Sequence, residues 1–438
     1  MTIHFKSKLN KMHHRQVYNI RIYSDFTWRH VGKMKAIIFL DTNQSGSSRE
    51  GIKAAKEMGF FTHLLTNRAS ILEKNKEFTE VDEMHAVNLK QKESIEEAIM
   101  NIRSTYQVVG IISFIDPYVH VAAELSNHLC HTNLSVESIK IMENKARMRA
   151  CLKEKKYSPY YLIVQENESI HPVTCLLKGR YPLVVKMPNS AGSKDVFFIE
   201  NEYELRNRIK YLRKRYPGEE ILIEEYLEGP QFIVEAIVFE GTIHIAAVVE
   251  QEITRRKRFI VTGYSVVLNR NKEMYNRLIE TSREIISELD VENGNCHLEL
   301  RWVEGEWKLI EINPRISGGI MNKLVEEAYG FSYVEQILKI YLGNEPLLVR
   351  KHKNHVYAHY MTVHLVGTLL KVTGRNEARK EPGVIEIYIK PKNGQTLTPP
   401  LSMGHRYGYV LAKGRTESEA KEIALKAASH IHFHLKPI

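Results

Sequence analysis

The chain has 438 residues and a formal net charge of +10 at pH 7, and this length allows two to four domains. Its hydrophobic fraction of 43% and charged fraction of 26% are those of an ordinary globular protein, and no run approaches the roughly 18 apolar residues of a membrane helix. Four scattered cysteines without a Cys-x-x-Cys pair argue against structural zinc and a disulfide framework, and favour a cytoplasmic protein.

The positive charge is concentrated in a basic leader, residues 1–33, which holds seven Lys or Arg and one acid, Asp25. The rest of the chain lacks the mixture of aromatic and basic residues typical of nucleic-acid binding, so we expect no nucleic-acid partner there. The leader has no long apolar run and is not a secretory signal. We interpret it as disordered or not native, because Met34 directly precedes the first strand; a transit peptide is the alternative.

Apolar runs at 35–41 and 61–66, with a helical pattern between them, predict a βαβ unit. A third strand is expected at 108–114, followed by a helix through His128. This alternation predicts a doubly wound N-terminal α/β domain over residues 34–133. No Gly-x-Gly-x-x-Gly motif follows the first strand, so a dinucleotide site is not predicted.

Residues 135–157 have a helical pattern, with Ser135 as its N-cap and Glu137 in its first turn. A strand that ends at Lys186, a loop of small residues and a second strand follow. Further strands are expected in 221–251, and a helix over 272–288.

Residues 295–319 predict two strands around a turn at Glu304-Gly305-Glu306. If the hairpin is centred on Gly305, Glu299 faces Glu311 and His297 faces Asn313. Because side chains alternate along a strand, these four polar residues share one face. The other face is apolar and carries Leu298, Leu300, Ile310 and Ile312.

Facing carboxylates repel each other unless a cation lies between them. The oxygens of Glu299, Glu311 and Asn313 suit Mg²⁺, which commonly shares a substrate phosphate. Arg315, just after these residues, is placed to bind phosphate through its guanidinium group. The alternative is an acidic pair on a solvated hairpin face.

A helix over 322–341 is expected to close this unit. Residues 346–438 read as short strands and turns that end in a helix, with a capping box at Thr416 and Glu419. One face of this helix is apolar, and its residues are Ala420, Ile423, Ala424, Ala427, Ala428 and Ile431.

The succession of Lys145, Lys186 with its loop, the strand at 221–227 and the acidic hairpin resembles the ATP-grasp superfamily, and within it the carboxylate–amine ligases that include L-amino-acid (dipeptide) ligases. The resemblance covers nearly all of the chain after Met34. It implies an α/β and α+β multidomain protein with an ATP-grasp fold.

In that arrangement the doubly wound domain precedes an ATP-grasp domain at 134–345, which includes a lid at about 155–225. A small C-terminal α+β domain at 346–438 follows, similar to that of biotin-carboxylase-like members.

The resemblance also implies a role for each matched residue. Lys186 and Arg315 are the expected catalytic residues, and Glu299, Glu311 and Asn313 are the expected ligands of Mg²⁺ or Mn²⁺. The expected ATP-binding residues are Lys145, Lys186, Asn189, Ser190, Gly192, Ser193, Glu224, Glu225, Tyr226, Leu227 and Gln231.

Within this set, the residues from Glu224 to Leu227 are expected at the base and Gln231 at the ribose. The sequence departs from the family pattern at Met187, where proline is frequent, at Lys194-Asp195, where a second glycine is common, and at Gln231, which is often Glu.

The implied reaction is ATP-dependent ligation, in which a carboxylate attacks the γ-phosphate and an amine then displaces phosphate from the acyl phosphate to give an amide. The expected partners are ATP and small carboxylate and amine substrates, of which amino acids are the first candidates; a homodimer fits the family, and no membrane partner is expected.

Two alternatives remain: an acceptor amine on a carrier protein or a carboxylase-type acceptor, and a non-catalytic nucleotide-binding protein. Substrate specificity is expected in the loops at 45–49 and 116–118 and in the segment 252–268. The basic run 254–258 is either an anion-binding segment or a solvated turn.

Overall fold

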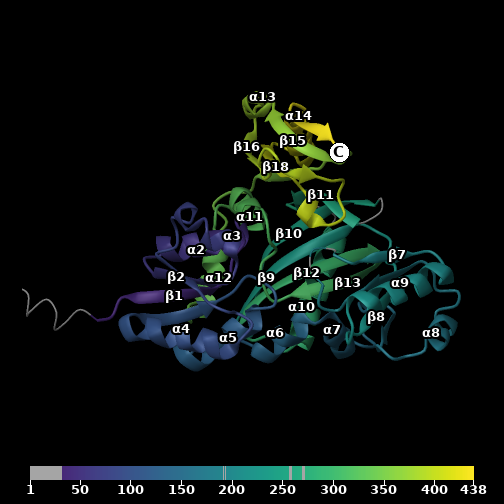
Figure 1. Cartoon of the computed structure of the whole chain (residues 1–438), viewed down its shortest axis with the longest axis horizontal. Coiled ribbons are helices and arrows are strands. Elements are labelled where there is room, and N and C mark those ends of the chain that lie inside the picture. The colour runs from purple at the N-terminus through teal and green to yellow at the C-terminus, as the bar shows by residue number, and fades with distance from the viewer. Residues whose placement is uncertain (1–31, 191, 193, 256–258, 269–271) are drawn as a thin grey trace, which may run out of the picture.

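The computed structural model describes residues 32–190, 192, 194–255, 259–268 and 272–438. These residues form four sheets. Figure 1 shows the N-terminal sheet with its helices on the left, the central sheet in the middle, a smaller sheet on the right and the C-terminal strands above.

The N-terminal sheet is parallel, with the strand order β3-β2-β1-β4. Its strands are β1 (Lys35–Leu40), β2 (Phe61–Thr66), β3 (Glu83–Ala86) and β4 (Gln107–Ile112), and its helices are α2 (Ser47–Glu57), α3 (Ala69–Leu72), α4 (Lys92–Thr105) and α5 (Val119–Cys130). Ile37 and Leu64 belong to one apolar cluster and Ile38 and Leu65 to another, so helices cover both faces of the sheet. The predicted strands are present, whereas β3, a four-residue strand without an apolar run, was not predicted.

The helical region predicted at 135–157 is interrupted at Asn144 and gives two helices, α6 (Val136–Glu143) and α7 (Lys145–Cys151). The Asn144 side chain caps α7, because its Oδ1 accepts hydrogen bonds from the backbone N–H groups of residues 146 and 147, each at 3.0 Å. Ser135 precedes α6 without capping it. Its Oγ instead accepts from Glu292 N and Asn293 N at 2.9 and 3.0 Å, which joins α6 to the start of a central strand.

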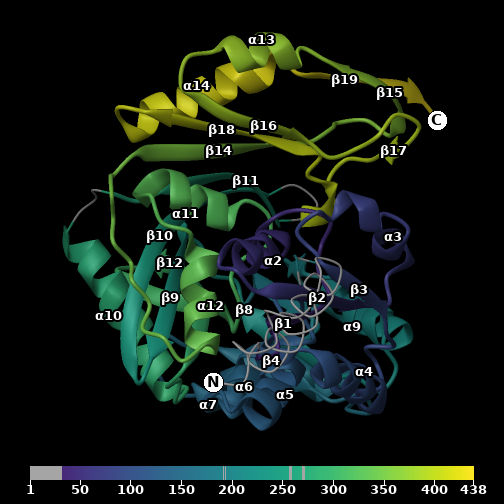
Figure 2. The same cartoon turned by 90° about the vertical axis from the view of Figure 1, so that its left-hand side faces the viewer.

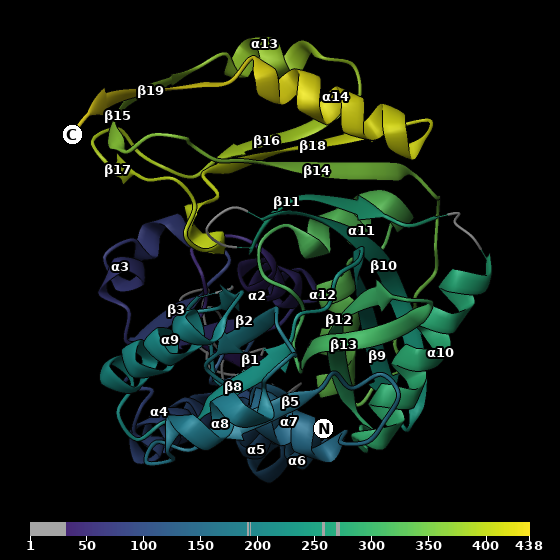
Figure 3. The same cartoon turned by 90° about the vertical axis from the view of Figure 1, so that its right-hand side faces the viewer.

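The small sheet is antiparallel, has the order β5-β8-β6-β7 and carries its own apolar core. Its strands are β5 (Tyr161–Val164), β6 (Leu183–Lys186), β7 (Phe197–Ile199) and β8 (Ile221–Glu225), and its helices are α8 (Ile170–Leu176) and α9 (Glu202–Arg215). Figure 3 shows this unit beside the edge of the central sheet formed by β12 and β13.

The central sheet has eight antiparallel strands in the order β13-β12-β9-β10-β11-β14-β18-β16. The strands before residue 345 are β9 (Gln231–Phe239), β10 (Thr242–Arg255), β11 (Phe259–Val266), β12 (Gly294–Val303) and β13 (Glu306–Asn313), and the predicted helix α10 (Lys272–Glu288) lies between β11 and β12.

The C-terminal strands continue this sheet, as Figure 2 shows, because β14 pairs with β11 in the register Gly263↔His359. They are β14 (His355–Met361), β16 (Val384–Ile389) and β18 (Gly408–Gly414). A sheet of β17 (Thr396–Leu397), β15 (Gly367–Thr373) and β19 (His432–Pro437), with helix α13 (Arg375–Lys380), completes the C-terminal part.

The helix predicted over 322–341 is two helices, α11 (Met321–Tyr329) and α12 (Tyr333–Tyr341). Gly330 ends α11 with φ +81°, a backbone conformation that glycine adopts at little cost. Ser332 then starts α12, since its Oγ accepts from Glu335 N at 3.4 Å. The single predicted helix is therefore wrong at this break.

The last predicted helix is α14 (Glu417–Ser429), but the chain continues into β19 and does not end in the helix. Thr416 Oγ1 accepts from Glu419 N at 3.2 Å, which is half of the predicted capping box. The Glu419 carboxylate accepts from Arg415 N, one residue before the cap. The predicted apolar face packs as expected.

No helix in the described part of the chain is long and apolar enough to cross a membrane.

Candidate functional site

The acidic hairpin has the predicted register, since Glu299 pairs with Glu311 and His297 with Asn313. The turn is shorter than predicted, because Val303 pairs with Glu306 around Glu304 and Gly305, both with positive φ. A β-bulge between Glu299 and Leu300 compensates for this difference. The prediction of the facing carboxylates is confirmed.

The bulge changes the apolar face of β13. Leu309, not Ile310, is buried in the core opposite Leu300, whereas Ile310 is half-buried and lines a cavity beside Glu311. The prediction that Ile310 shares the apolar face with Leu300 is therefore wrong. The extra residue of a bulge turns two successive side chains toward the same side, which strict alternation does not anticipate.

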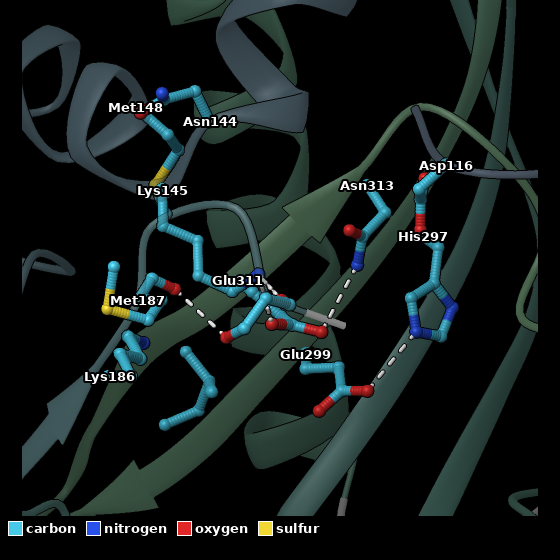
Figure 4. A network of polar contacts seen from close by, with 12 residues as sticks. Asp116, Asn144, Lys145, Met148, Lys186, Met187, His297, Glu299, Glu311 and Asn313 are labelled. Atoms are coloured by element: carbon cyan, nitrogen blue, oxygen red, sulfur yellow. Dashed lines mark hydrogen bonds and ion pairs between the residues drawn. The ribbon is translucent and has the colours of Figure 1, made fainter. Parts of the chain in front are cut away.

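The cavity has a volume of about 650 Å³, and the hairpin forms one of its walls. Lys145 on α7, Lys186 on β6 and residues 224–227 at the end of β8 also line it, as do Lys390 and Arg406 from the C-terminal part. Figure 4 shows Lys145, Lys186, Glu299, Glu311 and Asn313 converging on one region. Four separate parts of the chain thus contribute to one site.

Lys145 is buried at the first position of α7 and not on a solvated helix face. Its Nζ donates to Ser190 O at 2.8 Å and lies 3.2 Å from Glu311 Oε2. Burial alone would raise the pKa of Glu311, but Lys145, Lys186 and His297 lower it to about 2. Glu311 is therefore ionised at neutral pH.

Lys186 and Glu224 form a buried ion pair, with Nζ 2.6 Å from Oε2, and Arg149 donates to the other carboxylate oxygen. Burial lowers the pKa of Lys186, although Glu224 opposes this change. Burial would raise the pKa of Glu224, but the neighbouring Arg149 and Lys186 lower it. The Glu224 side chain, expected at the base, thus holds Lys186 in position.

Arg149 was not identified from the sequence, where it reads as a surface residue of a helix. Its Nη2 donates to Leu309 O at 2.9 Å and to Ile310 O at 2.7 Å, while its Nε donates to Glu224. This fully buried side chain therefore joins β8 to the bulged strand β13.

Glu299 accepts a hydrogen bond from Gln231 Nε2 at 2.7 Å, and Arg301 Nε donates to Gln231 Oε1 at 2.8 Å. Gln231, predicted at the ribose, is thus held between Arg301 and Glu299 and lines the cavity. Arg301 was not identified from the sequence. Its side chain also donates to Leu227 O, which joins the hairpin to the end of the segment 224–227.

His297 is buried between two carboxylates, with Nδ1 2.8 Å from Glu235 Oε1 and Nε2 3.3 Å from Glu299 Oε1. Burial alone would lower the pKa of His297, but Glu235 and Glu299 raise it to about 10. A protonated imidazole here holds the Glu299 carboxylate in place.

Arg315 forms a two-point contact with Asp116 in the loop after β4. Its Nε donates to Asp116 Oδ1 at 2.9 Å, and a second nitrogen contacts Oδ2. Burial opposes the charge, yet Asp116 keeps the pKa of Arg315 above its usual value. The loop at 116–118, predicted to affect specificity, therefore reaches the site through this residue, which lines the cavity.

The small-residue loop after β6 contributes Ser190 and Gly192 to the cavity wall. Asn189 is exposed, does not line the cavity and accepts a hydrogen bond from Asn144 Nδ2 at 3.2 Å. Ala191 and Ser193 lie outside the described residues.

Asp195, at the position where a second glycine is common, has φ +53° and accepts from Tyr216 OH at 2.5 Å. The backbone thus keeps a glycine-like conformation here, which Asp tolerates better than most residues. Of the basic run at 254–258, the structure describes Thr254, which is exposed, and the backbone of the next residue; residues 256–258 lie outside the described part.

The residues at the cavity fit a divalent cation by their donor chemistry. Glu299 and Glu311 sit at directly paired strand positions and both line the cavity together with Asn313. Asn313 Nδ2 donates to Glu311 Oε1 at 3.2 Å. Two carboxylates and an amide are the oxygen donors that Mg²⁺ and Mn²⁺ prefer, and the nearby lysines suit phosphate oxygens.

Two family models match the chain. An ATP-grasp domain matches residues 179–323, which include β6, β8, the central strands and the hairpin. An L-amino acid ligase C-terminal domain 2 matches residues 359–436. The two matches include Lys186, the hairpin and most of the strands that extend the central sheet, whereas Lys145 and Asp116 lie outside both of them.

The chain is similar over most of its length to known proteins. It is 22% identical to an uncharacterized protein, y4rH, of Sinorhizobium fredii, over 92% of this chain and 84% of that protein. It is 22% identical to an L-arginine-specific L-amino acid ligase of Bacillus subtilis, over 68% of this chain and 73% of that one. The fold matches a crystal structure of an L-amino acid ligase from Bacillus licheniformis with a TM-score of 0.79 and 18% identity, over 93% of this chain and all of the other.

Proposed function

Since the chain belongs to the ATP-grasp superfamily and carries the C-terminal domain of L-amino acid ligases, we propose that it is an ATP-dependent carboxylate–amine ligase that forms an amide bond through an acyl phosphate. The observation that supports this most strongly is the convergence of Lys145 and Lys186 with Glu299, Glu311 and Asn313 on one cavity. Phosphoryl transfer needs positioning and charge neutralisation more than covalent catalysis, and this is the chemistry that these residues supply.

The buried cations are assigned to the phosphates of ATP. Lys186 is held in place by Glu224, and Lys145 by Ser190 and Glu311. Both ammonium groups are thus held at the cavity wall before a triphosphate enters, which organises the site for anionic oxygens in advance. Residues 224–227, next to these lysines along the cavity wall, are assigned to the base.

The hairpin is assigned to the metal. Glu299, Glu311 and Asn313 would hold Mg²⁺ or Mn²⁺, which would neutralise charge on the transferred phosphate. His297 and Gln231 keep the Glu299 carboxylate in place through hydrogen bonds, and Asn313 does the same for Glu311.

The reacting carboxylate belongs near Arg315. The substrate carboxylate attacks the γ-phosphorus, its oxygen forms the new P–O bond, and ADP leaves. The amine nitrogen then attacks the acyl carbon, loses a proton to solvent or base, and phosphate leaves with the C–O bond electrons. Arg315, held by Asp116 at the cavity wall, is placed to balance the charge on the transferred group. Amino acids are the proposed source of both substrates.

The test is a pairwise screen of amino acids with ATP and Mg²⁺, with phosphate release as the first measurement and mass spectrometry of the products as the second. The proposal expects ADP, phosphate and a condensed product in equal amounts for at least one pair. Phosphate release only with a carrier protein or with bicarbonate would replace the proposed acceptor. ATP binding without phosphate release for any pair or acceptor would contradict the proposed activity.

Glu311→Gln provides the negative control for this screen, because it removes a proposed metal ligand and its charge. Glu306→Gln is a matched substitution at an exposed position of the same strand. We expect turnover to fall by about 10²–10³ in the first variant and to stay unchanged in the second. Near-normal ATP turnover in Glu311→Gln would refute the metal assignment.

A further inference from the structure

Three polar side chains gather at the outer edge of the N-terminal sheet, in a different sheet from the acidic hairpin. In the described structure β3 is the edge strand and pairs with β2, in the register His63↔Glu83 and Leu65↔His85. Figure 2 shows the two strands side by side. Because residues two apart on a strand share a face, His63, Glu83 and His85 project to the same side.

The ligand atoms of these three residues are separated by nearly equal distances. His63 Nδ1 lies 3.1 Å from His85 Nε2 and 3.4 Å from Glu83 Oε2, and His85 Nε2 lies 3.7 Å from Glu83 Oε2. A tetrahedral zinc ion with ligands at about 2.0–2.2 Å requires ligand atoms about 3.3–3.6 Å apart. The observed triangle therefore matches one face of a zinc tetrahedron to within a few tenths of an ångström.

The surroundings suit metal binding at this triangle. Burial lowers the pKa of His63 to about 4 and also lowers that of His85, which favours the neutral imidazole whose lone pair a metal binds. Tyr106 OH donates to Glu83 Oε1 at 3.1 Å, which leaves Oε2 facing the two histidines. A hydrogen bond of this kind orients a metal-binding carboxylate.

Two further observations concern His63 and the open side of the cluster. His63 is completely buried, and its Nε2 has no hydrogen-bond partner among the described residues. Its Nδ1 is the nitrogen that faces His85 and Glu83. The side chains of His85 and Glu83 are 31% and 46% exposed, so water has access to a fourth ligand position.

We propose that His63, Glu83 and His85 bind Zn²⁺, with water as the fourth ligand, and that the ion links the edge strand β3 to β2. The scattered cysteines argued against structural zinc, but this site contains no cysteine and is assembled by the pairing of two strands. The site is independent of the proposed ligase activity. A bound ion would also help to protect the exposed edge strand β3, since an unprotected edge can pair with another chain.

The test is zinc titration of the metal-stripped full chain in millimolar Mg²⁺, with a chromophoric chelator as competitor. We expect His85→Asn and Glu83→Gln to bind one tight equivalent of zinc fewer than the unsubstituted chain. Tyr106→Phe should keep that equivalent with about 10–100-fold lower affinity. His128→Asn, at an exposed position of α5 in the same part of the chain, is the matched control and should bind as the unsubstituted chain does.

Two measurements separate this site from other zinc-binding groups. Zinc should raise the unfolding temperature of the unsubstituted chain and of His128→Asn, but not that of His85→Asn or Glu83→Gln. ATP turnover without zinc should be the same in all of these chains. If both ligand variants bind as many equivalents of zinc, with the same affinity, as the unsubstituted chain, the three residues form only a hydrogen-bonded cluster and the proposal is wrong.

Discussion

Lys145 Nζ lies 3.2 Å from Glu311 Oε2 and also donates to Ser190 O at 2.8 Å. One ammonium group thus joins the start of α7, the small-residue loop and the acidic hairpin. Asn144 sets this position, because its side chain caps the helix that begins at Lys145. The capping residue therefore fixes where the helix that carries this cation begins.

The first prediction concerns Lys145→Met, which keeps the length of the side chain and removes its charge. We expect ATP turnover to fall by about 10²–10³, the usual loss when one group that stabilises the transition state is removed. Lys153→Met, at an exposed position just after α7, is the control and should keep normal turnover. Steady-state phosphate release measures both, and equal rates in the two variants would contradict the role proposed for Lys145.

The second prediction concerns stability at acid pH. The pKa of Glu311 is about 2 in the folded chain and near 4.5 when unfolded, so ionised Glu311 stabilises the fold above about pH 4.5. This contribution is lost as the pH falls from there toward 2, because the unfolded state binds the proton first. Urea unfolding of the native chain and of Glu311→Gln at several pH values measures it.

In that experiment the free energy of unfolding of the native chain should fall more steeply with decreasing pH than that of Glu311→Gln. Glu306→Gln should follow the native curve, since Glu306 is exposed. Parallel curves for all three chains across this range would show that Glu311 titrates alike in the folded and unfolded states.

The third prediction concerns Ile310, the extra residue of the bulge, which lies between Leu309 and Glu311. Ile310→Ala removes apolar surface from the cavity wall, so we expect KM for ATP to rise by about tenfold or more, in line with the 1.5–3 kcal/mol that burial of such a side chain contributes, while kcat changes little. Leu309→Ala should instead destabilise the fold by about 2–5 kcal/mol, because Leu309 is fully buried. If Ile310→Ala only destabilised the protein and left KM unchanged, Ile310 would be a core residue after all.

The fourth prediction concerns the pair of Arg315 and Asp116. Arg315→Lys keeps the charge but loses the two-point contact with the carboxylate, and we expect kcat to fall by about 10²-fold. Asp116→Asn should cause a smaller fall, because a neutral acceptor remains for the guanidinium. Arg206→Lys, in an exposed pair with Glu202, is the control. A larger loss for Asp116→Asn than for Arg315→Lys would indicate that Asp116 itself contacts substrate.

The fifth prediction compares two glycines with the same backbone conformation. Gly46 and Gly59 have φ of +87° and +88°, but a Cβ at Gly46 would lie 2.6 Å from Gly319 O. At Gly59 no described residue other than its two chain neighbours would lie within 4 Å of such an atom. Both alanine variants bear the conformational strain. Gly46→Ala should be destabilised by about 1–3 kcal/mol more, because it is also overpacked.

Chemical denaturation measures that difference directly. Gly319 lines the cavity and accepts from Ser47 N at 3.1 Å, so Gly46→Ala should also lower ATP turnover, while Gly59→Ala should not. Equal stability of the two variants would mean that the contact between the N-terminal unit and the loop after the hairpin relaxes without cost.

The candidate site was predicted from the sequence where its parts are local. Glu299 and Glu311 belong to one hairpin, so alternation could place them on facing positions. They do pair there, because the bulge offsets the shorter turn. Alternation also placed Ile310 on the apolar face of the hairpin, because a bulge leaves no pattern in the apolar residues. The breaks at Asn144 and Gly330 do carry local signals, a capping residue and a glycine, which a continuous helical pattern obscured.

What the sequence determined by itself is which residue types the candidate site contains, because these lie at short spacing: the lysine at the end of a strand, the small-residue loop and the acidic hairpin. Only the tertiary structure decided which partners hold these groups. Arg149 lies 75 residues from Glu224, and Asp116 lies 199 residues from Arg315. Contacts at such separations depend on how sheets and helices pack, and no periodicity along the chain encodes which side chains then meet.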